Sequence, residues 1–237
     1  MTNRIQTHKL LVVVAIMMVF GIYTLATAVP VQAWDKPNAA ELKVLGKTIG
    51  QWSAKWWQWT LSIPEGSNPI REGDCNQNQS GPVWFLAGNE GSVSDRECRV
   101  PSGKHILFPL VNALYWNDSV SEPVSVEQKR SELDFFLSLG CNLSATIDGT
   151  PSVYHNPTIR TQSPTFPIKF IENNIYGESA GWVDKKAVSD GFWVMLPPLD
   201  KGDHVIHFTG AFCDGGEPFI EVDVTYQITV LPGKQRY

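Results

Sequence analysis

The chain has 237 residues, of which 43% are hydrophobic and 18% charged, and its formal net charge is −5. This much apolar side chain excludes global disorder and is enough for one sizeable core. The acidic balance argues against nucleic acid as a partner, because the phosphate backbone attracts basic surfaces.

The N-terminal segment has the pattern of a signal peptide over residues 1–33. Arg4 and Lys9 form a basic start, and the almost wholly apolar run 10–30 follows. A basic segment, an apolar segment and then small residues are typical of a signal that is removed on export. We expect cleavage between Ala33 and Trp34. The alternative is a retained anchor, because an apolar run of about 20 residues is long enough to span a bilayer.

We expect residues 34–237 to form a single exported domain, which touches a membrane only if the signal segment is retained. Its four cysteines form an even set, and in an exported chain this indicates two disulfides. We favour Cys75 with Cys98 and Cys141 with Cys213, because each bridge then stays within one half of the chain. The other two pairings remain open. The cysteines lack the close spacing of a zinc site.

Two capping boxes predict two α-helices. In each box, a hydroxyl side chain and a glutamine three positions later satisfy free backbone N–H groups at the helix start. The box at 48–51 predicts a helix over about 49–63, and the box at 125–128 predicts one over about 126–139. On the first helix, tryptophans at i, i+4 and i+7 form a stripe: Trp52, Trp56 and Trp59.

The segment 68–103 is rich in Gly, Asn, Ser and Asp, and this composition predicts a long loop. One apolar run, 83–87, interrupts it and is short enough for a buried strand. A bridge between Cys75 and Cys98 would hold this Cys-bounded loop (75–98) down. A second apolar run follows at 105–116 and contains Pro109, which predicts an edge strand or a bulge.

Strict alternation of apolar and polar residues over 220–230 predicts a long C-terminal strand with one buried face. We expect it to pair with 204–212, which a turn-rich connection joins to 192–196. Alternation also predicts a strand over 143–147. The predicted fold class is therefore mainly β: a disulfide-stapled antiparallel β-sandwich with the two helices as accessory elements.

Several segments, in this order, resemble a family of exported bacterial proteins that has no assigned biochemical function: WSAKWWQW, GPVWFLAG, LSATIDG and SDGFWVMLPPL. The resemblance covers most of residues 46–230. It implies a bacterial periplasmic or extracellular protein with a β-sandwich, and it supplies no catalytic residues. The C-terminal part is also similar to immunoglobulin-like β-sandwiches.

Nine tryptophans are many for a chain of this length. Aromatic faces stack on sugar rings, so exposed tryptophans would form a platform for a glycan or an envelope component. We expect the stripe instead to pack its helix onto the sandwich. Trp57 lies off the stripe and Trp116 lies in a polar stretch, so these two are the predicted ligand-binding residues.

The histidines do not predict a metal site. His204 and His207 lie three positions apart, which places them on opposite faces of a strand, and His105 and His155 are isolated. The sequence contains neither a phosphate loop nor an H-E-x-x-H motif. We therefore expect no metal and no cofactor.

Five acids surround the Cys-bounded loop, where a bridge could bring two carboxylates together for hydrolysis: Glu72, Asp74, Glu90, Asp95 and Glu97. Acids in such loops are more often solvated. Asp148 and Asp190 each precede a glycine, and this pattern predicts side-chain hydrogen bonds within turns.

These observations favour an exported, non-enzymatic binding or structural module that recognises a glycan, an envelope component or a protein partner. The alternative is a hydrolase that acts on an envelope or extracellular polymer through the acids of the 72–97 loop. Convergence of those acids in a cleft would favour the hydrolase.

Overall fold

The computed structural model describes residues 43–152 and 159–232. The signal segment, its Ala33–Trp34 junction and His155 lie outside the described residues. Two five-stranded sheets, a short two-stranded hairpin and two α-helices account for the regular structure of the described ranges, apart from two short 3-10 turns. The predicted mainly β class is confirmed.

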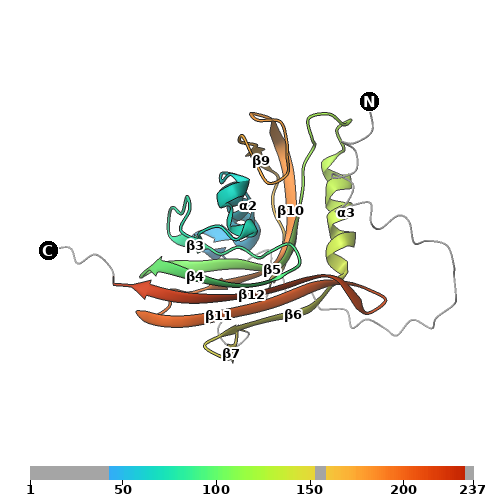
Figure 1. Cartoon of the computed structure of the whole chain (residues 1–237). Helices are drawn as coiled ribbons and strands as arrows, with labels where there is room; N and C mark the ends of the chain where they lie inside the picture. The colour runs from blue at the N-terminus through green and yellow to red at the C-terminus, as the bar shows by residue number, and fades with distance from the viewer. Residues whose placement is uncertain (1–42, 153–158, 233–237) are drawn as a thin grey trace. The chain divides into compact units, whose positions relative to one another are not determined.

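The first sheet has the strand order β3-β5-β10-β8, and β9 pairs with the beginning of β10. Its strands are β3 (Val83–Phe85), β5 (His105–Tyr115), β8 (Ile159–Gln162), β9 (Phe166–Lys169) and β10 (Val183–Leu196). The second sheet has the order β4-β12-β11-β6-β7. Its strands are β4 (Val93–Pro101), β6 (Gly140–Ile147), β7 (Thr150–Pro151), β11 (Gly202–Asp214) and β12 (Glu217–Leu231). In Figure 1, β4, β12 and β11 run side by side below the helix α2 (Ile49–Thr60).

The first sheet is buried on both faces. Trp84 and Val194 pack into the core between the two sheets, whereas the adjacent Phe85 and Trp193 pack into a second core under α2. Successive residues of these strands therefore enter different cores, which explains why the sequence shows continuous apolar runs here instead of alternation.

The second sheet is buried on one face only. Along β12, Val224, Tyr226 and Ile228 are at most 1% exposed, while the residues between them lie on the outer face. The predicted C-terminal strand and its pairing with β11 are confirmed. However, β4 pairs with β12 in parallel, as β3 does with β5, so two of the pairings depart from the antiparallel pattern.

Both helices begin at the predicted caps. A hairpin of β1 (Lys43–Val44) and β2 (Lys47–Thr48) leads into α2, and both hydrogen bonds of the Thr48–Gln51 box are present. The helix ends at Thr60, and a turn continues to Pro64. The second helix, α3 (Val126–Ser138), lies beside β10 (Figure 1), and its N-cap hydroxyl accepts from the backbone N–H at the third position.

One local prediction is wrong. The predicted loop 68–103 contains the strand β4, whose inward positions Ser94 and Arg96 are polar and so conceal the alternation. The prediction of an edge strand or a bulge at Pro109 is confirmed in its second form, because the register between β5 and β10 shifts beside Pro109. The predicted connection between 192–196 and 204–212 is present, and it passes from the first sheet to the second.

Both disulfides occur in the favoured pairing. Cys75–Cys98 joins the segment before β3 to β4, with Cα atoms 5.8 Å apart. Cys141–Cys213 joins β6 to β11, with Cα atoms 6.1 Å apart. Two disulfides are typical of proteins that fold in an oxidising compartment. None of the helices in the described ranges is long and apolar enough to cross a membrane.

Candidate functional site

The two tryptophans predicted to bind a ligand are not exposed platforms. Trp57 is 3% exposed, and its ring meets that of Trp56 edge-on at 5.0 Å. The expectation that Trp57 faces solvent is therefore wrong. Trp116 is half-buried: its ring packs against Tyr176 at 4.8 Å, and its indole N–H donates to Glu178 at 3.0 Å.

The tryptophan stripe packs α2 onto the first sheet, as predicted. Trp52, Trp56 and Trp59 are all buried in the core under the helix. Each indole N–H donates to a backbone oxygen at 2.8 Å, and the acceptors are Val44, Leu86 and Gln77 respectively. The rings thus contribute apolar burial and also fix the segments around the helix.

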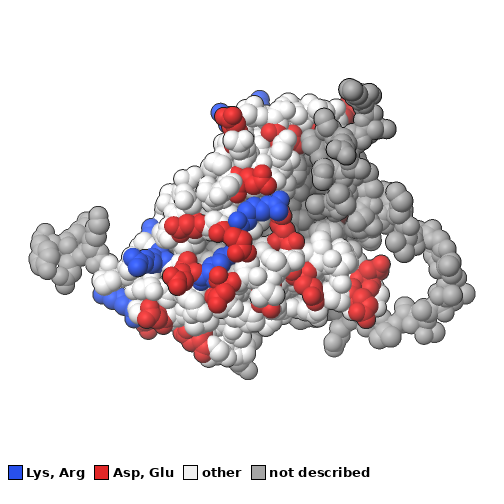
Figure 2. All heavy atoms as spheres, in the orientation of Figure 1, with Lys and Arg blue, Asp and Glu red and all other residues white. Residues whose placement is uncertain are grey.

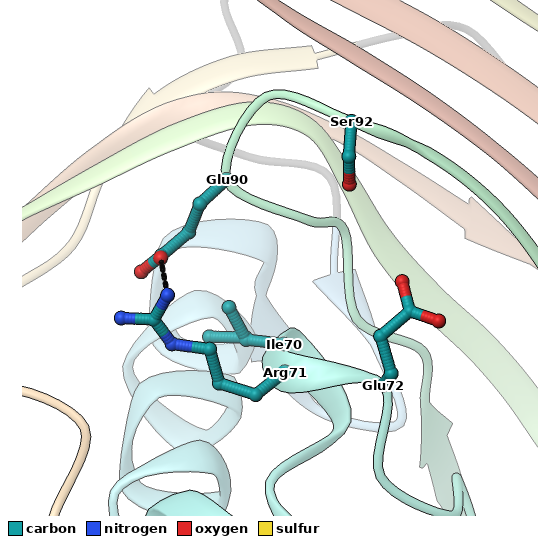
Figure 3. A pocket seen from close by; sticks show the side chains of 5 residues that line it. All are labelled: Ile70, Arg71, Glu72, Glu90 and Ser92. Carbon is teal, nitrogen blue, oxygen red and sulfur yellow. Dashed lines mark ion pairs between the residues drawn. The ribbon is translucent and has the colours of Figure 1, made fainter.

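A pocket of about 320 Å³ opens between the 3-10 turn η2 (Pro69–Arg71) and the loop that leads into β4. Its lining residues are Ile70, Arg71, Glu72, Glu90 and Ser92. This volume lies at the lower end of the range of roughly 300–1,000 Å³ that is typical of small-molecule sites. Two of the five predicted acids, Glu72 and Glu90, meet here (Figure 3).

The other three acids do not reach this pocket. Asp95 and Glu97 occupy outward positions of β4 and are exposed on the far face of the second sheet. Asp74 accepts hydrogen bonds from the backbone and the side chain of Asn76 at 2.8 and 2.6 Å. The 72–97 loop therefore contributes a pair of carboxylates to the pocket.

A buried asparagine, Asn68, positions the pocket wall, which is formed by η2 and Glu72. Asn68 is fully buried, and its Nδ2 donates to the carbonyl oxygens of Thr60 and Ile63 at 2.8 and 3.0 Å. Its Oδ1 accepts from the backbone N–H of Ile70 at 3.1 Å. One side chain thus joins the end of α2 to the start of η2, so the wall is fixed to the helix that covers the second core.

The pocket wall carries backbone strain. Glu72 has φ 69° and ψ 14°, in the left-handed region. Among the described residues, Glu72 and Leu45 are the two with positive φ that are neither Gly, Asn nor Asp. The next residue, Gly73, has no room for a side chain, because a Cβ there would lie 2.0 Å from the Ser67 carbonyl oxygen. Such conformations cost on the order of 1 kcal/mol or more and concentrate at functional sites.

The two carboxylates of the pocket have different arginine partners. Nη1 of Arg71 lies 2.5 Å from Oε2 of Glu90, on one side of the pocket (Figure 3). On the other side, Oε1 of Glu72 accepts from the Ser94 hydroxyl at 2.8 Å and lies 4.0 Å from Nη2 of Arg96. Each carboxylate of the pocket therefore has an arginine beside it, one in the lining and one buried behind it.

Arg96 forms a buried polar centre behind Glu72. Its Nη1 donates to the carbonyl oxygens of Ala87 and Gly88 at 3.0 and 3.2 Å and to the hydroxyl of Tyr226 at 3.0 Å. Its Nε is buried without a hydrogen-bond partner. Burial raises the pKa of Tyr226, although Arg96 opposes that shift. Arg96 is not among the predicted site residues, because the polar inward positions Ser94 and Arg96 conceal the alternation of β4.

A second charged network lies between α3 and β10. Lys129 is fully buried and its Nζ lies 2.7 Å from Oδ2 of Asp184. Burial alone would raise the pKa of Asp184, but hydrogen bonds from Lys129 and from the backbone N–H groups of Asn117 and Lys186 hold it below its usual value. This network attaches α3 to the first sheet.

The two aspartates that precede glycines have different roles. Asp148 lies in the turn between β6 and β7, as predicted, and accepts from the backbone N–H of Val205 at 2.8 Å. Asp190 does not lie in a turn. It is buried in β10, 3.0 Å from the guanidinium of Arg160.

Two histidines, His204 and His207, pair with carboxylates. Nδ1 of His204 lies 2.7 Å from Asp148, and Nε2 of His207 lies 2.9 Å from Asp223. Burial lowers the pKa of His204, but the hydrogen bonds to Asp148 and to the Asp200 carbonyl oxygen, together with the charges of both aspartates, raise it overall. Over residues 43–152 and 159–232, no three His, Cys, Asp or Glu side chains are grouped so as to hold a metal ion.

Acidic side chains outnumber basic ones on the face shown in Figure 2, where the two kinds lie close together near the centre of the view. Comparison with known proteins adds no assignment: no family model, no curated protein and no solved structure matches this chain.

Proposed function

We propose that this protein is an exported binding module without catalytic activity, and that it binds a small polar ligand in the pocket between η2 and the β4 loop. The N-terminal signal pattern and the two disulfides support export. The segments that resemble an exported bacterial family favour the periplasm or the outside of a bacterial cell as its location.

The main support for this proposal is that each carboxylate of the pocket lies beside an arginine. Glu90 pairs with Arg71, and Glu72 lies near Arg96. Their side chains are also 43% and 65% exposed. A glycoside hydrolase needs one carboxyl group that stays protonated, which requires an apolar or water-excluding environment. Solvated carboxylates beside guanidinium groups are suited to binding instead.

The rigidity of the wall also supports binding. Asn68 fixes η2 to α2, and the Cys75–Cys98 bridge fixes the chain that follows. A site that is already ordered loses little conformational entropy when it binds a ligand, so even few contacts give measurable affinity.

The convergence of two carboxylates keeps a hydrolase as the second candidate. Glu72 and Glu90 are the acids that such an enzyme would use, because both line the same pocket. The two candidates make different predictions for a ligand that binds: the enzyme cleaves it, and the binding module leaves it intact.

A paired binding and cleavage assay tests the proposal. The oxidised protein is screened by thermal shift against oligosaccharides and cell-wall fragments, and each hit is then incubated with the protein and analysed for new reducing ends. A ligand at about 100 times its dissociation constant should add roughly 2.7 kcal/mol of stability. We expect a shift without cleavage.

A double variant locates the binding. Arg71→Met with Glu90→Met removes the ion pair at unchanged net charge and should abolish the shift. Its matched control is Arg99→Met with Glu97→Met, which removes the same two residue types from outward positions of β4. Cleavage that disappears in Glu72→Gln would establish the hydrolase, and a shift that survives in the pocket variant would place the ligand elsewhere.

A further inference from the structure

Resting on the proposed function, we infer that the pocket recognises an uncharged, hydroxyl-rich group, namely a neutral sugar residue of a glycan. Three features support this: the pairing of opposite charges at the pocket, the hydrogen-bonding groups that line it, and the buried Arg96 behind it.

Each charged group that lines the pocket already has a neighbour of opposite charge. Arg71 pairs with Glu90 and lies 4.0 Å from Glu65 outside the lining, and Glu72 lies 4.0 Å from the buried Arg96 behind it. A cationic ligand would meet a guanidinium and an anionic ligand would meet a carboxylate, so either one must displace an existing partner. Like charges placed together disfavour a ligand strongly, which selects against both charged classes.

A hydroxyl group fits this pattern because it both donates and accepts hydrogen bonds. The carboxylates accept, the Arg71 guanidinium donates, and the hydroxyl of Ser92 does either. Carboxylates and guanidinium groups are also planar and bidentate, so each can engage two neighbouring hydroxyls at once. Adjacent hydroxyls on one ring are the defining feature of a sugar.

The buried Arg96 keeps one of these groups in position. Its side chain is 7% exposed, its Nη2 lies 4.0 Å from Glu72 and 3.4 Å from the Ser94 hydroxyl, and its Nε is buried without a partner. Arg96 is thus a fixed positive charge behind Glu72, whose Oε1 also accepts from the Ser94 hydroxyl at 2.8 Å. We regard Arg96 as a positioning residue, because Glu72 lies between it and the pocket.

Ile70 offers the apolar contact that the C–H face of a sugar ring needs, and none of the five lining residues is aromatic. Hydrogen bonds to hydroxyls compete with water, so without aromatic stacking we expect dissociation constants in the millimolar range for a single ring.

Sugars that share a ring and differ in charge test the inference directly. The oxidised protein, labelled with ¹⁵N, is titrated with glucose, galactose, mannose and N-acetylglucosamine, and with glucosamine and glucuronate as charged counterparts. We expect at least one neutral sugar to shift the amide resonances of residues 70–72 and 90–92, and both charged rings to bind at least tenfold more weakly.

Two single variants should change which charged sugar binds, and a purely structural role of the replaced residues would not produce that change. Glu90→Gln removes the nearest carboxylate from Arg71 and should bring glucuronate binding to at least the level of the neutral ring. Arg71→Met should do the same for glucosamine. Both side chains are partly exposed, and thermal melts should confirm that the variants fold. Glu97→Gln and Arg99→Met, on the outward positions of β4, should leave the preference unchanged.

The outcomes distinguish a failure of the neutral-sugar inference from a failure of the proposed binding function. Tighter binding of glucosamine or glucuronate to the unaltered pocket would overturn the neutral-sugar inference and leave the binding function standing. If no ring, neutral or charged, shifts the resonances of the pocket, both the inference and the proposed binding pocket are overturned.

Discussion

The core under α2 and the pocket wall adjoin one another in the sequence, but they are built in opposite ways. The core contains large buried rings, and the indole N–H groups of Trp52, Trp56 and Trp59 donate to backbone oxygens. The wall contains a non-glycine residue in the left-handed region, Glu72, and a buried arginine with an unpartnered Nε. Apolar burial is therefore concentrated in the core, whereas the pocket wall combines backbone strain with a buried charge, a combination expected of a functional site.

The largest effect should come from the core. Trp56 is 1% exposed and its ring contacts those of Trp57, Trp59 and Trp193. Trp56→Ala should lower the free energy of unfolding by about 3–5 kcal/mol, because it leaves a large cavity and a free carbonyl on Leu86. Urea unfolding measures the loss. A change below about 1 kcal/mol would show that this core is not the main source of stability.

Within one strand, two arginines should differ sharply. Arg96→Met removes donors from the buried carbonyl oxygens of Ala87 and Gly88, so we expect a loss of about 1–3 kcal/mol. Arg99→Met changes an exposed position of the same strand and should stay within about 0.5 kcal/mol of the parent. Equal losses in urea unfolding would contradict the assignment of Arg96 as the polar centre of the wall.

The network at α3 should respond to pH. The folded-state pKa of Asp184 lies below its ordinary value of 3.8, because Lys129 and two backbone N–H groups outweigh the effect of burial. The stabilisation that this group provides is therefore present above about pH 3.8 and is lost as the pH falls through the lower, folded-state value. Urea midpoints measured from pH 5 downward should decline less steeply in Asp184→Asn than in the parent. Asp214→Asn, at the exposed end of β11, should leave the slope unchanged.

The smallest change in stability should accompany a large change in binding. Glu72→Gly relieves the left-handed strain and frees the unfolded chain, so the two effects should nearly cancel and stability should stay within about 1 kcal/mol of the parent. Leu45→Gly relieves the same strain away from the pocket. Ligand binding, followed by titration, should be lost in Glu72→Gly and retained in Leu45→Gly. Loss of binding in both would mean that the pocket responds to remote changes in the backbone.

The sequence predicted the parts of the fold that obey a simple period. The alternation over 220–230 became β12, and the Thr48–Gln51 box became the start of α2. The strand β4 was missed, because its buried positions include Ser94 and Arg96, and polar residues do not register as a buried face. The sequence also did not show that β10 and β11 belong to different sheets, because the connection between them contains no signal for a change of sheet.

The candidate site was predicted only in part. Glu72 and Glu90 were singled out as acids, and the structure brings them together in one pocket. The exposure of Trp57 was predicted wrongly, because a helix can also bury residues that lie beside its main apolar stripe. Arg96 and Asn68 could not be predicted as site residues, since their importance comes from tertiary partners that are distant in the sequence or from a loop conformation.

The parallel pairing of β4 with β12 has a consequence for the order of folding. These strands are separated by most of the described chain, and their register joins Arg96 directly to Tyr226. Contacts of such long sequence separation form slowly, because a large loop must close before they contribute any stability. The Cys75–Cys98 bridge and α2 can form locally and early. The hydrogen bond between Arg96 and Tyr226 forms only after β12 has paired with β4. The buried polar centre behind the pocket is therefore completed late in folding.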